Sequence, residues 1–111
     1  MEASKPPIPQ AVTDMVERIV SEFDPDLVLL FGSYARGTAD EGSDVDLLVV
    51  MPVVGSRRSA ATEIDRLLID RRIPLDVIVV TPEEFERNRD LVGSAVRQAT
   101  LEGQVVYERA A

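Results

Sequence analysis

The 111-residue chain contains no cysteine, no histidine and no tryptophan. The lack of cysteine excludes disulfides, thiolate-held zinc, iron–sulfur clusters and a thiol nucleophile. The lack of histidine excludes a Ser-His-Asp triad and any metal held by imidazole. An enzyme of this composition has to work with carboxylates, hydroxyls, arginines and metals that prefer oxygen ligands.

Positive charge is also scarce. Twelve Lys and Arg residues stand against twenty Asp and Glu, which gives a formal net charge of −8, and Lys5 is the only lysine. An acidic surface repels a phosphate backbone, so we expect no general binding of nucleic acid. A nucleotide site is still compatible with this net charge, because a bound divalent cation can make the local electrostatic potential positive.

Long apolar runs are missing as well. The run from Leu47 to Val54 is broken at Pro52 and is too short to cross a bilayer. No apolar segment of signal-peptide type follows Met1. The apolar content of 45% is typical of a globular protein. We therefore expect a cytoplasmic protein with no membrane contact, made of a flexible lead-in at residues 1–9 and a single domain at 10–111.

Hydrophobic periodicity, caps and breakers predict the secondary structure. The predicted elements are a helix at 10–23, a strand at 27–31, a helical turn at 33–36 capped by Ser33, a strand at 44–51, a helix at 59–73, a strand at 75–80, one helix or two short ones from 82 to 102, and a strand at 104–107. This order indicates an α+β fold, similar to α/β, in which helices flank a small mixed sheet.

Three carboxylates lie at strand starts, where apolar residues are expected. Asp44 and Asp46 open the second strand and, two residues apart, point to the same face. Asp76 opens the third strand, which a crossover helix makes parallel to the second. An antiparallel first strand brings its end, at Gly32 and Ser33, to the same edge of the sheet. We therefore expect these segments to converge.

Clustered carboxylates repel one another unless a cation neutralises them. Magnesium suits the role, because it takes oxygen ligands from one or two carboxylates plus substrate phosphates, and a pair of such ions can clamp an in-line phosphoryl displacement. Gly32 permits close approach of a phosphate, and Ser33 offers a hydroxyl and a free N–H at a helix start. Arg36, one turn later, is the nearest cation for a polyphosphate.

The stretch from Phe31 to Val50 reads Phe-Gly-Ser-Tyr-Ala-Arg-Gly-Thr-Ala-Asp-Glu-Gly-Ser-Asp-Val-Asp-Leu-Leu-Val-Val. Gly32-Ser33, followed after ten residues by Asp44-Val45-Asp46, resembles the signature of the polymerase-β-type nucleotidyltransferases. The fuller string is similar to the minimal nucleotidyltransferases, which are the small antitoxin partners of HEPN toxins. Chain length, element order and the acid at Asp76 extend the resemblance over most of the chain.

The resemblance implies a polymerase-β-type core that uses ATP and two Mg²⁺ ions. It assigns catalysis and metal binding to Asp44, Asp46 and Asp76, the last as a third ligand or as acceptor of the hydroxyl proton. It assigns nucleotide binding to Gly32, Ser33, Arg36 and Ser43. Within the minimal group, it implies an antitoxin that transfers AMP from ATP to a tyrosine hydroxyl of a HEPN ribonuclease toxin.

Two alternatives stay open. The protein neutralises its partner by binding alone, or it adenylylates a small molecule. Because the sequence shows no further domain to hold an acceptor, we expect another molecule to present it, which favours a protein partner. Val105, Val106 and Tyr107 either complete the core or face that partner. The pairs Arg57-Arg58 and Arg71-Arg72 are interpreted as solvated helix ends.

Overall fold

The computed structural model describes residues 6–110. The first five residues of the predicted lead-in at 1–9 therefore lie outside the described part, as does residue 111. The elements in chain order are α1 (Gln10–Phe23), β1 (Leu27–Phe31), α2 (Ser33–Arg36), β2 (Val45–Val50), α3 (Arg57–Leu67), β3 (Leu75–Val80), α4 (Pro82–Asn88), α5 (Ala95–Glu102) and β4 (Gln104–Glu108). In residues 6–110 no helix has the length and apolar character needed to cross a membrane.

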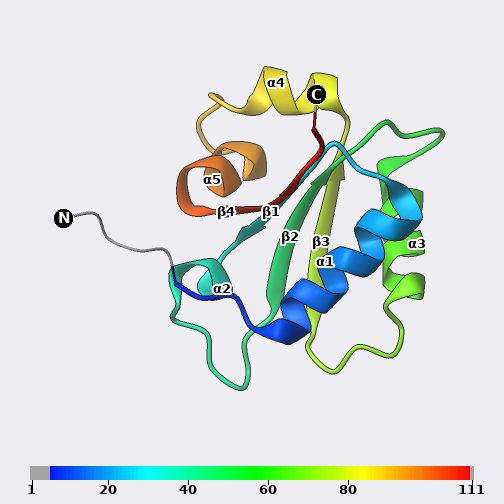
Figure 1. Cartoon of the computed structure of the whole chain (residues 1–111). Coiled ribbons are helices and arrows are strands. Elements are labelled where there is room, and N and C mark those ends of the chain that lie inside the picture. Colours follow the sequence, from blue (N-terminus) through cyan, green and yellow to red (C-terminus); the bar gives the residue numbers. More distant parts are fainter. Residues whose placement is uncertain (1–5, 111) are drawn as a thin grey trace.

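The four strands form one mixed sheet in the order β3-β2-β1-β4 (Figure 1). β1 pairs antiparallel with both β2 and β4, while β2 and β3 are parallel. The predicted mixed sheet with flanking helices is thus confirmed, including the antiparallel first pair and the parallel crossover pair. β2 and β3 begin at the same end of the sheet, where β1 ends.

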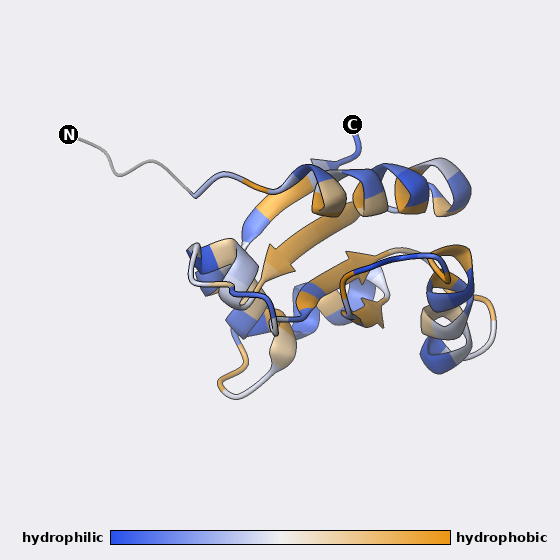
Figure 2. Cartoon of the chain, turned by 90° about the horizontal axis from the view of Figure 1, so that it is seen from below, coloured by the Kyte–Doolittle hydropathy of each residue, from blue (hydrophilic) through white to orange (hydrophobic). Residues whose placement is uncertain are grey.

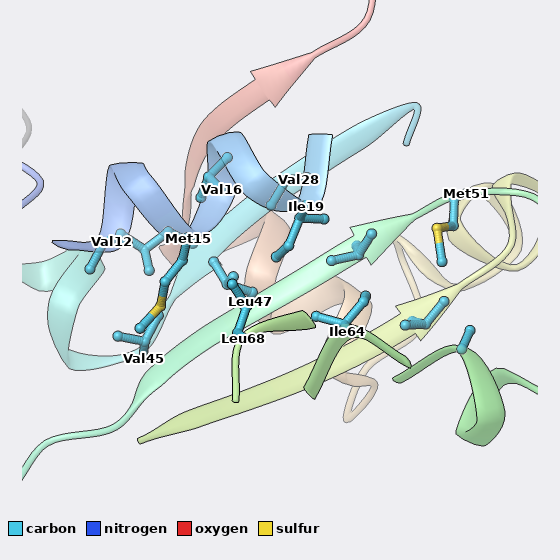
Figure 3. Close-up of a cluster of buried hydrophobic side chains, with 14 of the residues drawn as sticks. Val12, Met15, Val16, Ile19, Val28, Val45, Leu47, Met51, Ile64 and Leu68 are labelled. Carbon is cyan, nitrogen blue, oxygen red and sulfur yellow. The ribbon is translucent and has the colours of Figure 1, made fainter. Parts of the chain in front are cut away.

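Apolar side chains cover both faces of the sheet, which explains why the strands read as continuous apolar runs rather than alternating ones. On one face, α1, α3 and the residue after α3 pack on the sheet (Figure 3). They contribute Val12, Met15, Val16, Ile19, Ile64 and Leu68, which lie against Val28, Val45, Leu47 and Met51. On the other face, Phe85 of α4 and Val96 and Ala99 of α5 cover Leu29, Phe31, Leu48, Val50 and Val80. Figure 2 shows hydrophobic strands between helices whose outward surfaces are hydrophilic.

One predicted helix has different bounds in the structure. The helix predicted at 59–73 begins at Arg57, where Ser56 accepts a hydrogen bond from the Ser59 amide at 3.0 Å, and it ends at Leu67. Its end is early because the Arg71 guanidinium turns back and donates to the carbonyls of Leu68 and Asp65. That contact replaces the next helical turn with a tight loop.

The segment from 82 to 102 forms two short helices, one of the two forms that the sequence allowed. The break contains Gly93, whose φ of +90° lies in the left-handed region that favours glycine. Ser94 then caps α5 by accepting from the Arg97 amide at 3.0 Å. α4 begins with a full capping box between Thr81 and Glu84.

The end of the sheet opposite the start of β2 is closed by ion pairs. Arg109, just after β4, lies 3.0 Å from Asp24 and 3.0 Å from Asp26, which lead into β1. Val106 and Tyr107 of β4 pack against the α1 side of the core, while Val105 is 54% exposed. The strand predicted at 104–107 therefore completes the core with part of its apolar surface and leaves one valine at the surface.

Candidate active site

The strand register brings the candidate carboxylates together. Asp46 of β2 lies directly opposite Asp76 of β3, and on its other side it lies opposite Phe31, the last residue of β1. Asp44 immediately precedes β2. The predicted convergence of these segments at one end of the sheet is therefore what the topology produces, although β2 begins at Val45 rather than at Asp44.

The carboxylates lie on the sheet face that α4 and α5 cover elsewhere. Ile78 and Val80 share the face of Asp76, and Leu48 and Val50 share the face of Asp46, because alternate strand residues point the same way. α4 lies at the opposite end of the sheet (Figure 1). The end that carries the acids is thus open to solvent, with Asp44 and Asp76 exposed and Asp46 half-buried.

Gly32 lies directly against Asp46. A Cβ added at Gly32 would overlap Oδ2 of Asp46 and would lie 3.1 Å from its Cγ. The backbone of Gly32 has a φ of +75°, a conformation that side-chain-bearing residues rarely adopt. The backbone conformation therefore favours glycine, and any larger residue would also displace the Asp46 carboxylate.

Asp46 sits in an unfavourable environment for a negative charge. Burial raises the pKa of Asp46 above its ordinary value, and repulsion from Asp76 and Asp44 raises it further, while Arg36 acts in the opposite direction. The four side chains are thus electrostatically coupled. A cation at this place would relieve the repulsion, which is the physical condition for a metal site.

The turn α2 follows Gly32, and its geometry corrects one prediction. Ser33 was expected to cap the turn, but Gly32 occupies the cap position and Ser33 is the first helical residue. The Gly32 carbonyl accepts from the amides of Ala35 and Arg36 at 3.1 and 3.2 Å. Glycine has no side chain to accept a hydrogen bond, so no side-chain cap is formed. The Ser33 amide therefore opens the turn, as an anion-binding N–H does.

Two residues from the α5–β4 corner hold this turn in place, and the sequence reading did not single them out. Gln104, only 7% exposed, donates to the Ala35 carbonyl at 2.9 Å and to the Pro6 carbonyl at 3.3 Å. Oε2 of Glu102 lies 3.8 Å from a guanidinium nitrogen of Arg36. The available signal was a polar residue, Gln104, heading the apolar run of the last strand, because a buried amide needs hydrogen-bond partners.

Ser43 has a different environment from the other candidates. Its hydroxyl accepts from the Asp40 amide at 2.9 Å and donates to Asp40 Oδ1 at 3.2 Å. Asp40 Oδ1 also accepts from the Gly42 amide at 3.0 Å. Ser43 therefore closes the turn that leads to Asp44, and its hydroxyl is engaged within that turn.

The donor set fits magnesium by its chemistry. Within residues 6–110, no three acidic side chains already converge in the arrangement of a metal-binding group. Asp44 and Asp76 are exposed, and without a cation their carboxylates repel that of Asp46. Because Mg²⁺ uses only one or two carboxylates together with substrate phosphates and water, Asp46 with either neighbour supplies a sufficient protein share.

Comparison with known proteins places this geometry in context. The sequence profile of a family described as a nucleotidyltransferase domain matches residues 13–106. Two proteins of Methanocaldococcus jannaschii, both named as candidate protein adenylyltransferases, are similar in sequence. One is 45% identical over 67 residues, which is 59% of this chain but only 42% of the relative. The other is 31% identical over 100 residues and covers 88% of this chain and 96% of the relative.

Solved structures share the fold at low sequence identity. A nucleotidyltransferase candidate from Sulfolobus solfataricus has a TM-score of 0.62 at 24% identity, covering 90% of this chain and 79% of its own. A toxin–antitoxin complex with AMP-PNP has a TM-score of 0.56 at 20% identity, covering 87% and 73%. A complex of the tri-AMPylated HEPN toxin of Shewanella oneidensis with its MNT antitoxin has a TM-score of 0.50 at 19% identity, covering 90% and 71%.

Proposed function

Because the chain belongs to the nucleotidyltransferase domain family, we propose that it transfers AMP from ATP to a hydroxyl, that of a tyrosine, on a HEPN ribonuclease toxin, and so acts as the antitoxin. One observation carries the proposal. Asp46 and Asp76 are direct cross-strand neighbours, with Asp44 preceding them and Gly32 packed against the Asp46 carboxylate. Two relatives named for protein adenylylation support a protein acceptor.

The proposed reaction forms one bond and breaks one. The acceptor hydroxyl oxygen bonds to the α-phosphorus of ATP, the bond from that phosphorus to the oxygen bridging to the β-phosphate breaks, and pyrophosphate leaves. Asp76, exposed at the edge of the site, takes the hydroxyl proton. Gly32 and Ser33 bind the triphosphate through backbone N–H groups, and Arg36 contributes positive charge. Asp44 and Asp46, with Asp76, would hold Mg²⁺, which supplies charge neutralisation for the phosphates.

The test uses ATP labelled at the α-phosphate, magnesium, and the product of the neighbouring reading frame, once that frame is shown to encode a HEPN protein. We expect label on the HEPN protein with the unmodified chain and none with Asp44→Ala/Asp46→Ala. The matched control is Glu63→Ala/Asp90→Ala, which removes two exposed carboxylates far from the candidate site and should leave transfer unchanged. Equal labelling by the unmodified chain and the Asp44/Asp46 variant refutes the proposal.

The same proteins separate the two alternative functions. If the Asp44/Asp46 variant still binds the HEPN protein and still inhibits its ribonuclease activity, inhibition is steric and transfer is not the antitoxic act. If an aminoglycoside is labelled in the absence of any protein partner, the acceptor is a small molecule. Mass spectrometry of the labelled HEPN protein then gives the acceptor residue and the number of AMP groups.

A further inference from the structure

The outer edge of β3 presents backbone groups without a strand partner in the described residues. β3 is the last strand in the sheet order. Pro74 and Val80 turn their carbonyls toward β2, where they accept from the amides of Val45 and Met51 at 2.8 and 3.0 Å. In a parallel strand, alternate residues direct their backbone N–H and C=O groups to opposite sides of the strand. Residues 74, 76, 78 and 80 therefore face β2. The N–H and C=O of Val77 therefore point away from the sheet, as do those of Val79.

An open groove of about 820 Å³ runs along this edge. The residues that line it include Val77 and Val79 of β3, Arg57 and Arg58 from the start of α3, and Glu84 of α4. Figure 1 shows β3 at the border of the sheet, with α3 beside it and α4 following its end. The groove thus combines free strand edge with two guanidinium groups.

The charge of the groove differs from that of the whole chain, whose net charge is −8. Arg57 is paired with Glu84 at 2.6 Å. Arg58 is exposed and forms no ion pair within residues 6–110. The N-terminal end of α3 adds the positive end of its helix dipole. This surface therefore favours an occupant with negative charge.

The groove begins next to the candidate active site along β3. Asp76, the proposed proton acceptor, immediately precedes Val77. Asp76 points to the α4 face of the sheet, while Val79 packs on the α3 face with Ala60 and Ile64. A strand added outside β3 would follow the same alternation, since residues opposite each other share a face. Its residue beside Asp76 and its residue beside Val79 would therefore point to opposite faces.

We propose that this groove docks the acceptor protein through an extended, acidic segment that adds a strand to β3. The segment places its hydroxyl residue beside Asp76 and an acidic residue three positions along, toward Arg57 and Arg58. Three strand residues span about 10 Å, so one short segment connects the two points. The inference rests on the proposed function, because it assigns the acceptor's docking surface to that same site.

Binding of synthetic peptides tests the docking surface independently of transfer. The probes are fluorescent nine-residue Thr/Val-rich peptides with one Tyr and a Glu three residues before or after it, and the same peptides with Lys for Glu. Anisotropy is measured without nucleotide or metal. We expect one Glu peptide to bind at least about fivefold more tightly than its Lys counterpart, and Arg58→Glu to abolish that preference. Arg66→Glu, the same change two turns further along α3, should keep it.

A separate variant tests whether the outward backbone groups of β3 bind the peptide. Val77→Pro removes an outward N–H without removing a bond to β2, which an edge strand tolerates. It should weaken binding of the Glu peptide, with folding checked by circular dichroism. If Val77→Pro does not fold, Arg58→Glu decides the question.

Equal affinity for the Glu and Lys peptides overturns the inference. So does a dimer, detected by sedimentation, that Val77→Pro converts to monomer, because a second copy then occupies the edge. Peptide preference without transfer of AMP to any protein supports the docking surface and refutes the proposed function instead.

Discussion

Replacing Gly32 with alanine is the sharpest perturbation of the candidate site. The substitution adds one methyl group at a backbone φ of +75° and ψ of −156°, a region that is essentially restricted to glycine. The same methyl group overlaps the Asp46 carboxylate. Gly32→Ala should therefore both destabilise the fold and displace the carboxylate on which the chemistry depends.

The two costs can be estimated separately. Holding alanine in this backbone region costs about 1–3 kcal/mol. Moving the Asp46 side chain off its preferred rotamer adds about 0.5–1.5 kcal/mol. The free energy of unfolding should then fall by about 1.5–4.5 kcal/mol. Each kcal/mol lowers the melting temperature of a domain of this size by roughly 4–8 °C.

Two controls separate backbone strain from steric overlap. Gly93 has a φ of +90° with nothing within 4 Å of an added Cβ, so Gly93→Ala reports strain alone. An Asp46→Ala background removes the two Asp46 atoms nearest to an added Cβ at Gly32 and leaves the Cβ of residue 46 at 3.4 Å, which is an ordinary contact. Gly32→Ala should therefore cost less in that background than in the unmodified chain.

The assay is urea-induced unfolding of all five proteins, combined with AMP transfer by the two single glycine variants. Gly93→Ala should lose stability and keep its transfer activity, whereas Gly32→Ala should lose both. Equal costs of Gly32→Ala with and without the Asp46 carboxylate would refute the reasoning about overlap. Full activity of Gly32→Ala would refute the position assigned to Asp46 in the site.

Three further outcomes are expected. In metal-free protein, Asp46→Asn should be more stable than the unmodified chain at pH 7, because the fold raises the pKa of Asp46 above its ordinary 3.8. The stability advantage of the variant should grow as the pH rises from 3.8 through the native pKa of Asp46. Urea unfolding at several pH values measures it. Gln104→Leu leaves the Ala35 carbonyl without its donor and should cost about 1–3 kcal/mol, with a higher KM for ATP as the sign that the turn has loosened; an unchanged KM would contradict its positioning role. Gly103→Ala places a methyl group 2.7 Å from the Leu30 carbonyl oxygen and against backbone that cannot move aside, so thermal unfolding should show a loss of about 1–3 kcal/mol.

Much of the fold was predictable because the sequence marks where helices start and where strands end with strong local signals. Thr81-Pro82 starts a helix, Gly32 ends a strand, and apolar runs of five or six residues fit strands covered on both faces. The parallel relation of β2 and β3 followed from the length of the crossover. The end of α3 was not predictable, since it depends on Arg71 reaching back to backbone carbonyls. Hydrophobic spacing carries no information about such a contact.

The candidate site divides in the same way. The acids could be located because charged residues at the start of apolar strands violate the local pattern. The overlap between Gly32 and Asp46, by contrast, depends on the register of β1 against β2, which the sequence leaves open to a shift of one residue. Gln104 was missed because its partners, the carbonyls of Ala35 and Pro6, lie 69 and 98 positions away.

The contact between Gln104 and Ala35 bears on the order in which the parts of the candidate site are synthesised and assembled. Every acid of the candidate site has been synthesised once Asp76 emerges, but β1 gains its second neighbour only when β4 arrives, pairing Leu27 with Glu108. Gln104 belongs to that last strand. A growing chain therefore carries its carboxylates well before the amide that holds the Ser33–Arg36 turn. Pairing of β4 with β1 is thus the step that brings the Gln104 amide to the Ala35 carbonyl of the turn.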